Sequence, residues 1–155
     1  MAPDETAGAL KLRAEDADDL AVLSACLQDA LVPVCDLAYV PDQQIFVFVA
    51  NRFRWESGVR PLPGDGERQR ILCAVTFSAV SGVSYRGFRR SDEDRILALL
   101  AIRTDTESAA RPAILLEFSG HAAIRLEVTR IQCRAKDLGE PWPTPWHPRH
   151  DAEEP

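Results

Sequence analysis

The chain has 155 residues, a length typical of one domain, and 46% of them are hydrophobic, which excludes a chain disordered by composition. Its formal net charge of −6 argues against a general nucleic-acid-binding protein, and no apolar run approaches the ~18–20 residues of a membrane-spanning helix. The acidic N-terminus, MAPDETAGAL, lacks the order of a secretory signal, so we expect a cytoplasmic protein without a membrane partner.

The charge is unevenly distributed along the chain. Residues 51–103 contain ten arginines and six acidic side chains, a local charge of +4, whereas residues 1–50 carry −7 and residues 104–155 carry −3. This basic middle segment keeps open a local site for an anion in an acidic protein.

The cysteines and histidines do not have the spacing of a metal or redox site. Three histidines occur, His121, His147 and His150, and Pro148 disfavours a helix that would present the last two together. We predict no metal site, no cofactor and no catalytic residue, because no catalytic motif is recognised. Four cysteines without CxxC spacing each lie in an apolar stretch, where we expect reduced core thiols: Cys26, Cys35, Cys73 and Cys133.

The N-terminal part predicts a short strand followed by a helix. Residues 8–13 alternate as a strand does, and Asp16 then provides a good N-cap, with Asp19 at the third helical position. Apolar residues recur at steps of three and four from Leu20 onward, and Pro33 is expected to end the helix near Leu31.

After the helix the hydrophobic period changes to two, which indicates strands. The glycines and prolines of SGVRPLPGDGE, residues 57–67, predict a loop in this region. The clearest hairpin joins two strands through the turn Ser119-Gly120-His121. The strands predicted after the helix are residues 34–40, 45–55, 70–80, 83–88, 95–103, 113–118 and 122–128. For residues 95–103 a short helix is the alternative, and the turn-rich segment that follows favours the strand.

Short connections between successive strands favour antiparallel pairing, and one helix is too little to cover two sheet faces. We therefore predict an α+β fold, in which the N-terminal helix packs on a curved, mostly antiparallel, barrel-like sheet of about seven or eight strands. Residues 8–142 are expected to form a single globular domain, followed by a flexible tail containing proline and tryptophan at residues 143–155.

The segment NRFRWE, residues 51–56, has the composition of a nucleic-acid-binding surface. Because successive side chains of a strand point to opposite faces, Phe53 and Trp55 share one face and Arg52 and Arg54 the other. A platform for base stacking needs rings and cations on one exposed surface. We therefore expect the rings in the core and the two guanidinium groups in water.

Two further arginines begin the next strand, so four guanidinium groups gather near the 57–67 loop if the two strands pair. One interpretation is an exposed network with the neighbouring carboxylates, which would contribute little to stability. The other is a site for phosphate, a nucleotide or a carboxylate, because the guanidinium fork fits these anions. The candidate anion-binding residues are Arg52, Arg54, Arg68 and Arg70.

The segment GEPWPTPWHPRH, residues 139–150, combines four prolines with two tryptophans. The prolines favour an extended conformation, and an exposed tryptophan leaves a large apolar surface in water. We expect Trp142 to fold back onto the domain. Trp146 is the candidate anchor for a protein partner.

Four segments together resemble a small bacterial family catalogued as a domain of unknown function, DUF2948. The resemblance covers about residues 8–142 and implies one intact domain that includes Trp142, without implying an activity, a cofactor or an active site. The segments are LKLRAEDADDLAVLSACLQDA (10–30), NRFRWE (51–56), AIRLEV (123–128) and DLGEPW (137–142).

Three functions remain open on this basis. The leading hypothesis is a non-catalytic cytoplasmic binding or adaptor domain. The alternatives are a small-anion or nucleotide-binding protein that uses the arginine cluster, and an enzyme of an unrecognised class.

Overall fold

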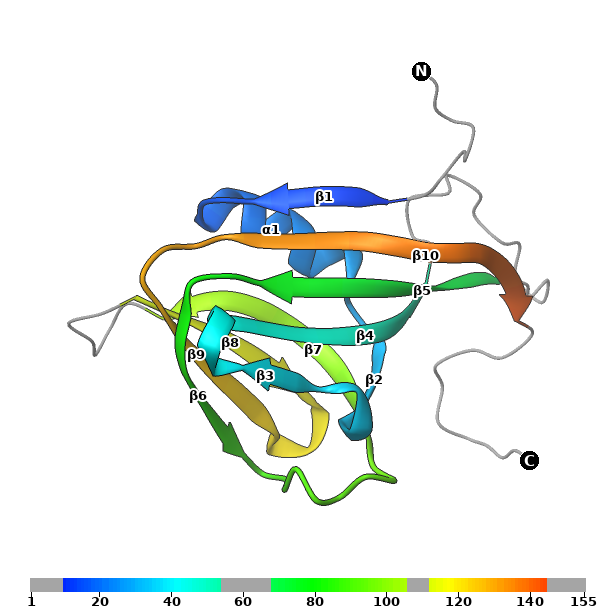
Figure 1. Cartoon of the computed structure of the whole chain (residues 1–155). Coiled ribbons are helices and arrows are strands. Elements are labelled where there is room, and N and C mark those ends of the chain that lie inside the picture. Colours follow the sequence, from blue (N-terminus) through cyan, green and yellow to red (C-terminus); the bar gives the residue numbers. More distant parts are fainter. Residues whose placement is uncertain (1–9, 54–67, 106–111, 145–155) are drawn as a thin grey trace.

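The computed structural model describes residues 10–53, 68–105 and 112–144, which contain one α-helix and ten strands (Figure 1). The helix is α1 (Ala17–Cys26), and single 3₁₀ turns occur at η1 (Val34–Asp36), η2 (Pro41–Gln43) and η4 (Ser119–His121). The strands are β1 (Lys11–Ala14), β2 (Leu31–Pro33), β3 (Ala38–Val40), β4 (Ile45–Phe53), β5 (Arg68–Phe77), β6 (Val80–Arg86), β7 (Ile96–Asp105), β8 (Ala113–Phe118), β9 (Ala123–Val128) and β10 (Cys133–Thr144).

The strands form one sheet in the order β1-β10-β5-β4-β2-β7-β8-β9-β6, and β3 pairs with β4 beside this path. Each of the described strand pairs is antiparallel. The α+β class and the antiparallel pairing are therefore confirmed. The predicted count of seven or eight strands is wrong, and the sheet is not closed as a barrel, because no described pairing joins its end strands β1 and β6.

The helix begins as predicted and ends five residues early. The Asp16 carboxylate accepts a hydrogen bond from the backbone N–H of Asp19 at 2.8 Å, which caps the first turn. At the other end, Asp29 adopts a left-handed backbone (φ 67°) and its N–H donates to the carbonyl of Leu99 at 2.8 Å. The chain therefore leaves the helix after Cys26, and Leu31 begins β2 instead.

One continuous core lies between α1 and the inner face of the sheet. The helix contributes the buried side chains of Leu20 and Leu23. Phe46, Phe48 and Phe77 form an aromatic row, with ring centroids 6.4 Å apart for each successive pair. This burial of apolar surface is the main contribution to stability.

No helix in the described part of the chain has the length and apolar composition that a membrane crossing requires.

Candidate functional site

The principal polar feature of the core is an ion pair between Arg52 on β4 and Asp137 on β10. The Arg52 Nε donates to Asp137 Oδ1 at 2.8 Å, and its second terminal nitrogen donates to Oδ2 at 2.7 Å. Both side chains are fully shielded from solvent. This two-pronged arrangement is the strongest geometry that a guanidinium and a carboxylate can form.

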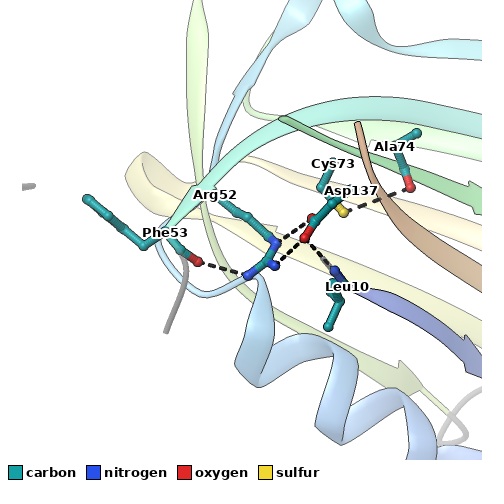
Figure 2. Close-up of polar contacts among 6 residues, drawn as sticks. All are labelled: Leu10, Arg52, Phe53, Cys73, Ala74 and Asp137. Atoms are coloured by element: carbon teal, nitrogen blue, oxygen red, sulfur yellow. Dashed lines mark hydrogen bonds and ion pairs between the residues drawn. The ribbon is translucent and has the colours of Figure 1, made fainter. Parts of the chain in front are cut away.

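The pair is also bonded to the backbone around it, as Figure 2 shows. Arg52 donates to the carbonyl of Phe53 at 2.9 Å, and the N–H of Leu10 donates to Asp137 Oδ2 at 2.6 Å. The carbonyl of Leu10 accepts from the backbone N–H of Asp137 at 3.0 Å. The pair therefore joins β4, β10 and the residue that precedes β1.

The orientation predicted for Arg52 is wrong. The alternation along β4 is regular, but the buried face is the one that carries Phe46, Phe48, Ala50 and Arg52. Burying a cation there requires a carboxylate partner, and Asp137, 85 residues away in the chain, provides it.

The predictions for the neighbouring residues have different outcomes. Burial of Phe53 is confirmed, since only 1% of it is exposed. Arg54 and Trp55 lie outside the described residues.

Arg70 lies on the other face of the sheet from Arg52, because it pairs with Phe53 in the register of β4 and β5 whereas Arg52 pairs with Ile71. It is 5% exposed. Its Nε donates to the Asn51 side-chain oxygen at 2.5 Å, and a terminal nitrogen donates to the Asn51 carbonyl at 2.9 Å.

The environment of Arg70 is mostly uncharged. Its guanidinium carbon lies 3.9 Å from the centroid of the Phe53 ring, which is a cation–π contact. Burial lowers the pKa of Arg70 from its ordinary value to about 10, and the carboxylate of Asp29 opposes this shift.

The structure therefore does not bring Arg52 and Arg70 into one pocket. The backbone of Arg68 pairs with Thr144 at the start of β5. The Arg68 side chain and the whole of Arg54 lie outside the described residues, so the part of these two arginines in an anion site stays a prediction.

The cysteines form no disulfide, as predicted. Their expected burial holds for Cys73 and Cys133 but is wrong for Cys35, which is exposed, and Cys26 is half-buried. Burial raises the pKa of Cys73 to about 12, with the nearby Asp137 acting in the same direction, and burial likewise raises the pKa of Cys133. Both groups are therefore neutral thiols at physiological pH, whereas a nucleophile must be a thiolate.

The remaining candidates give no assembled metal centre within the described residues, where no three His, Cys, Asp or Glu side chains gather. His121 is exposed in η4. The two other histidines and Trp146 lie outside the described part of the chain.

Asp137 is not among the site residues predicted from the sequence. A signal for it exists, because Cys133, Ala135 and Asp137 alternate with Arg134 and Lys136 in the pattern of a half-buried strand. If Cys133 and Ala135 face the core, the alternation places the Asp137 carboxylate in the core as well. A buried carboxylate there needs a cation as its partner.

These features define an α+β protein in which one helix packs on an open antiparallel sheet and a buried arginine–aspartate pair joins strands from distant parts of the chain. A family model described as protein of unknown function, DUF2948, matches residues 10–150, so the chain belongs to that family and the resemblance is confirmed. No curated protein and no solved structure matches the chain.

Proposed function

We propose that this chain is a non-catalytic binding domain of a bacterial cytoplasmic protein. The observation that supports the proposal is that the buried charges of Arg52 and Asp137 bind each other within the fold. Acid–base chemistry needs a group that exchanges protons with a substrate, whereas these two side chains are fully shielded and bonded to each other. The raised pKa values of the buried thiols agree with a structural role for them as well.

The same ion pair supports a scaffold for the C-terminal tail. Asp137 fixes the middle of β10, and after a register shift β10 continues along β5, where Trp142 pairs with Arg70 and Thr144 with Arg68. In our proposal residues 8–142 form the domain and residues 143–155 the tail, whose first two residues continue β10. The tail thus departs from a fixed position on the sheet.

In this proposal Trp146 is the anchor through which the tail contacts a protein partner. A large ring two residues beyond the end of β10 presents apolar area to a partner at low loss of conformational entropy. The full chain should capture a partner from bacterial lysate that is then identified, purified and titrated. The Trp146→Ala variant should weaken that binding at least about tenfold, which corresponds to ~1.4 kcal/mol.

Two variants control this experiment. A chain ended after Thr144 keeps all of β10 and should lose the partner as Trp146→Ala does, while retaining the unfolding midpoint of the full chain. His147→Ala changes the neighbouring residue and should bind normally. Equal affinity for all of these chains would remove the tail from the proposal, and turnover of a substrate by the purified protein would refute a non-catalytic role.

The arginine site for a small anion or a nucleotide remains the alternative, with Arg52, Arg54, Arg68 and Arg70 as its predicted residues. Participation of Arg52 would require it to leave Asp137 in the core, which disfavours it as a ligand contact. Thermal unfolding against phosphate and nucleotides tests the site, because a ligand at a hundred times its Kd adds about 2.7 kcal/mol. The shift should vanish in Arg54→Gln/Arg68→Gln. If no anion shifts the unfolding temperature, this alternative is eliminated. A pocket lined by convergent polar side chains would favour the third possibility, an enzyme.

A further inference from the structure

Four cations form a compact block on the outer face of β1 and β10, which we call the basic face: Lys11, Arg13, Arg134 and Lys136. The register places Lys11 directly opposite Lys136 and Arg13 directly opposite Arg134. All four are exposed, while Ala135, between the two cations of β10, and Ala14, next to Arg13, are buried on the inner face. The Cβ atoms of these residues therefore lie about 5 Å apart across the strands and about 7 Å apart along them.

None of the four cations of the basic face forms an ion pair within the described residues. On the adjacent strand β5, Ala74 is the register partner of Lys136 and Thr76 that of Arg134. Beyond them, β4 presents Val49 and Val47. Like charges directly opposite each other destabilise a sheet, so this arrangement opposes folding of the free protein.

Protection of an exposed sheet edge accounts for only half of this block. Cations on an edge strand such as β1 discourage pairing with other chains, which explains Lys11 and Arg13. It does not explain Arg134 and Lys136, because β10 is flanked by β1 on one side and β5 on the other (Figure 1).

The free edge of β1 offers backbone groups beside the same cations. The carbonyl of Leu10 bonds to β10, and in an antiparallel pair the backbone groups of successive residues point to opposite sides. The N–H and C=O groups of Lys11 and Arg13 therefore point away from β10. No described strand pairs with that edge.

We infer that the edge of β1 binds an extended acidic segment of a partner protein, which adds to the sheet as a further strand. Its backbone pairs with Lys11 and Arg13, and Asp or Glu side chains at alternate positions stand opposite these two cations. An extended peptide has the same two-residue side-chain repeat as β1. Carboxylates at alternate positions of the peptide therefore lie opposite Lys11 and Arg13 in turn. Arg134 and Lys136 strengthen the positive potential behind them.

Two other occupants fit less well. A second copy of this chain would place the cations of one β1 against those of the other, which is repulsive. Single-stranded nucleic acid binds through aromatic platforms, whereas the strands beside the basic face present residues such as Ala74, Thr76 and Val47. This surface is separate from the C-terminal tail, and a chain ended after Thr144 retains it.

Fluorescence anisotropy with the full chain tests the proposal. The probe is a labelled ten-residue peptide that alternates Glu and Thr, and the peptide controls alternate Gln and Thr or Lys and Thr. The acidic peptide should bind, and the controls should not. Lys11→Gln/Arg13→Gln should weaken binding about 2- to 30-fold. Arg86→Gln/Arg89→Gln removes two exposed cations elsewhere and should leave the affinity unchanged.

Further probes distinguish strand addition from simple charge attraction. An acidic peptide that is N-methylated at every amide has no N–H group to donate to the carbonyls of β1 in either strand orientation, so it should not bind. Equal binding of the methylated peptide, or no binding of the parent peptide up to about 1 mM, overturns the proposal. Oligothymidylate of equal charge that binds as tightly as the peptide would also overturn it, in favour of a phosphate-binding face.

Discussion

Two adjacent residues of β10 show how differently a charged side chain can be used in this protein. Asp137 points inward, where it is shielded from solvent and bonded to Arg52. Lys136 points outward, opposite Lys11, with no carboxylate partner among the described residues. The inner charge is matched and serves the fold, whereas the outer charge opposes the fold and is available to a partner. The contrast depends on which face each residue occupies, and the alternation of the strand decides that.

Removal of the Asp137 carboxylate is expected to change the free energy of unfolding more than the changes at Arg70 and Lys136 proposed below. Asp137→Ala leaves the guanidinium of Arg52 buried without its partner, so the free energy of unfolding should fall by about 3–5 kcal/mol. Urea denaturation at neutral pH measures it. A fall below about 1 kcal/mol would mean that the pair contributes little to the fold.

Arg70 provides an intermediate case, a nearly buried cation whose hydrogen-bond acceptors are the uncharged oxygens of Asn51. Arg70→Leu removes hydrogen bonds that are assisted by one charge only, so we expect a loss of about 1.5–3 kcal/mol, smaller than for Asp137→Ala. The same denaturation experiment measures it. A loss larger than that of Asp137→Ala would reverse the order that the ion pair predicts.

The buried thiol near Asp137 makes stability depend on alkaline pH. The folded state holds the pKa of Cys73 near 12, above its ordinary value of 9.0, so the folded protein retains a proton that the unfolded chain loses. The contribution of the Cys73 thiol to the free energy of unfolding is therefore fully present below pH 9. It is lost progressively as the pH rises toward 12. Cys73→Ala should flatten that part of the stability–pH curve relative to Cys35→Ala, a control at an exposed site. Parallel curves for the two variants would contradict the assignment.

The smallest expected change in stability is at Lys136 on the outer face, and it is a gain instead of a loss. Lys136→Glu replaces a repulsive cross-strand pair with an attractive one, so the free protein should gain a few tenths of a kcal/mol up to ~1 kcal/mol. The same variant should bind the acidic peptide more weakly than the unaltered chain. Thermal unfolding at low salt measures the gain, and Arg86→Glu is the control at a distant exposed cation. A destabilised Lys136→Glu variant would show that Lys136 has a structural partner.

Local patterns predicted much of the fold because they depend on neighbouring residues. The Asp16 cap and the alternation of β4, β8 and β9 all follow from the sequence within a few positions. The end of α1 did not follow, because the left-handed backbone of Asp29 is stabilised by a bond to Leu99, 70 residues away in the chain. β10 was missed because a carboxylate interrupts its apolar alternation and prolines follow.

The orientation of Arg52 was unpredictable for a related reason. Alternation establishes that Arg52 shares a face with Phe46 and Phe48, but it does not establish which face is buried when both carry apolar residues. The burial of Arg52 depends on Asp137, so identifying β10 as a strand was a condition for understanding the site.

Arg52 and Asp137 serve the fold as one unit, and a double-mutant cycle measures the coupling between them. The free energy of unfolding is measured for the unaltered chain, Arg52→Met, Asp137→Leu and the double variant. We predict that each single variant loses about 3–5 kcal/mol and that the double variant is more stable than either, because two apolar side chains of similar volume replace the pair. Additive losses in the double variant would show that Arg52 and Asp137 contribute to stability independently.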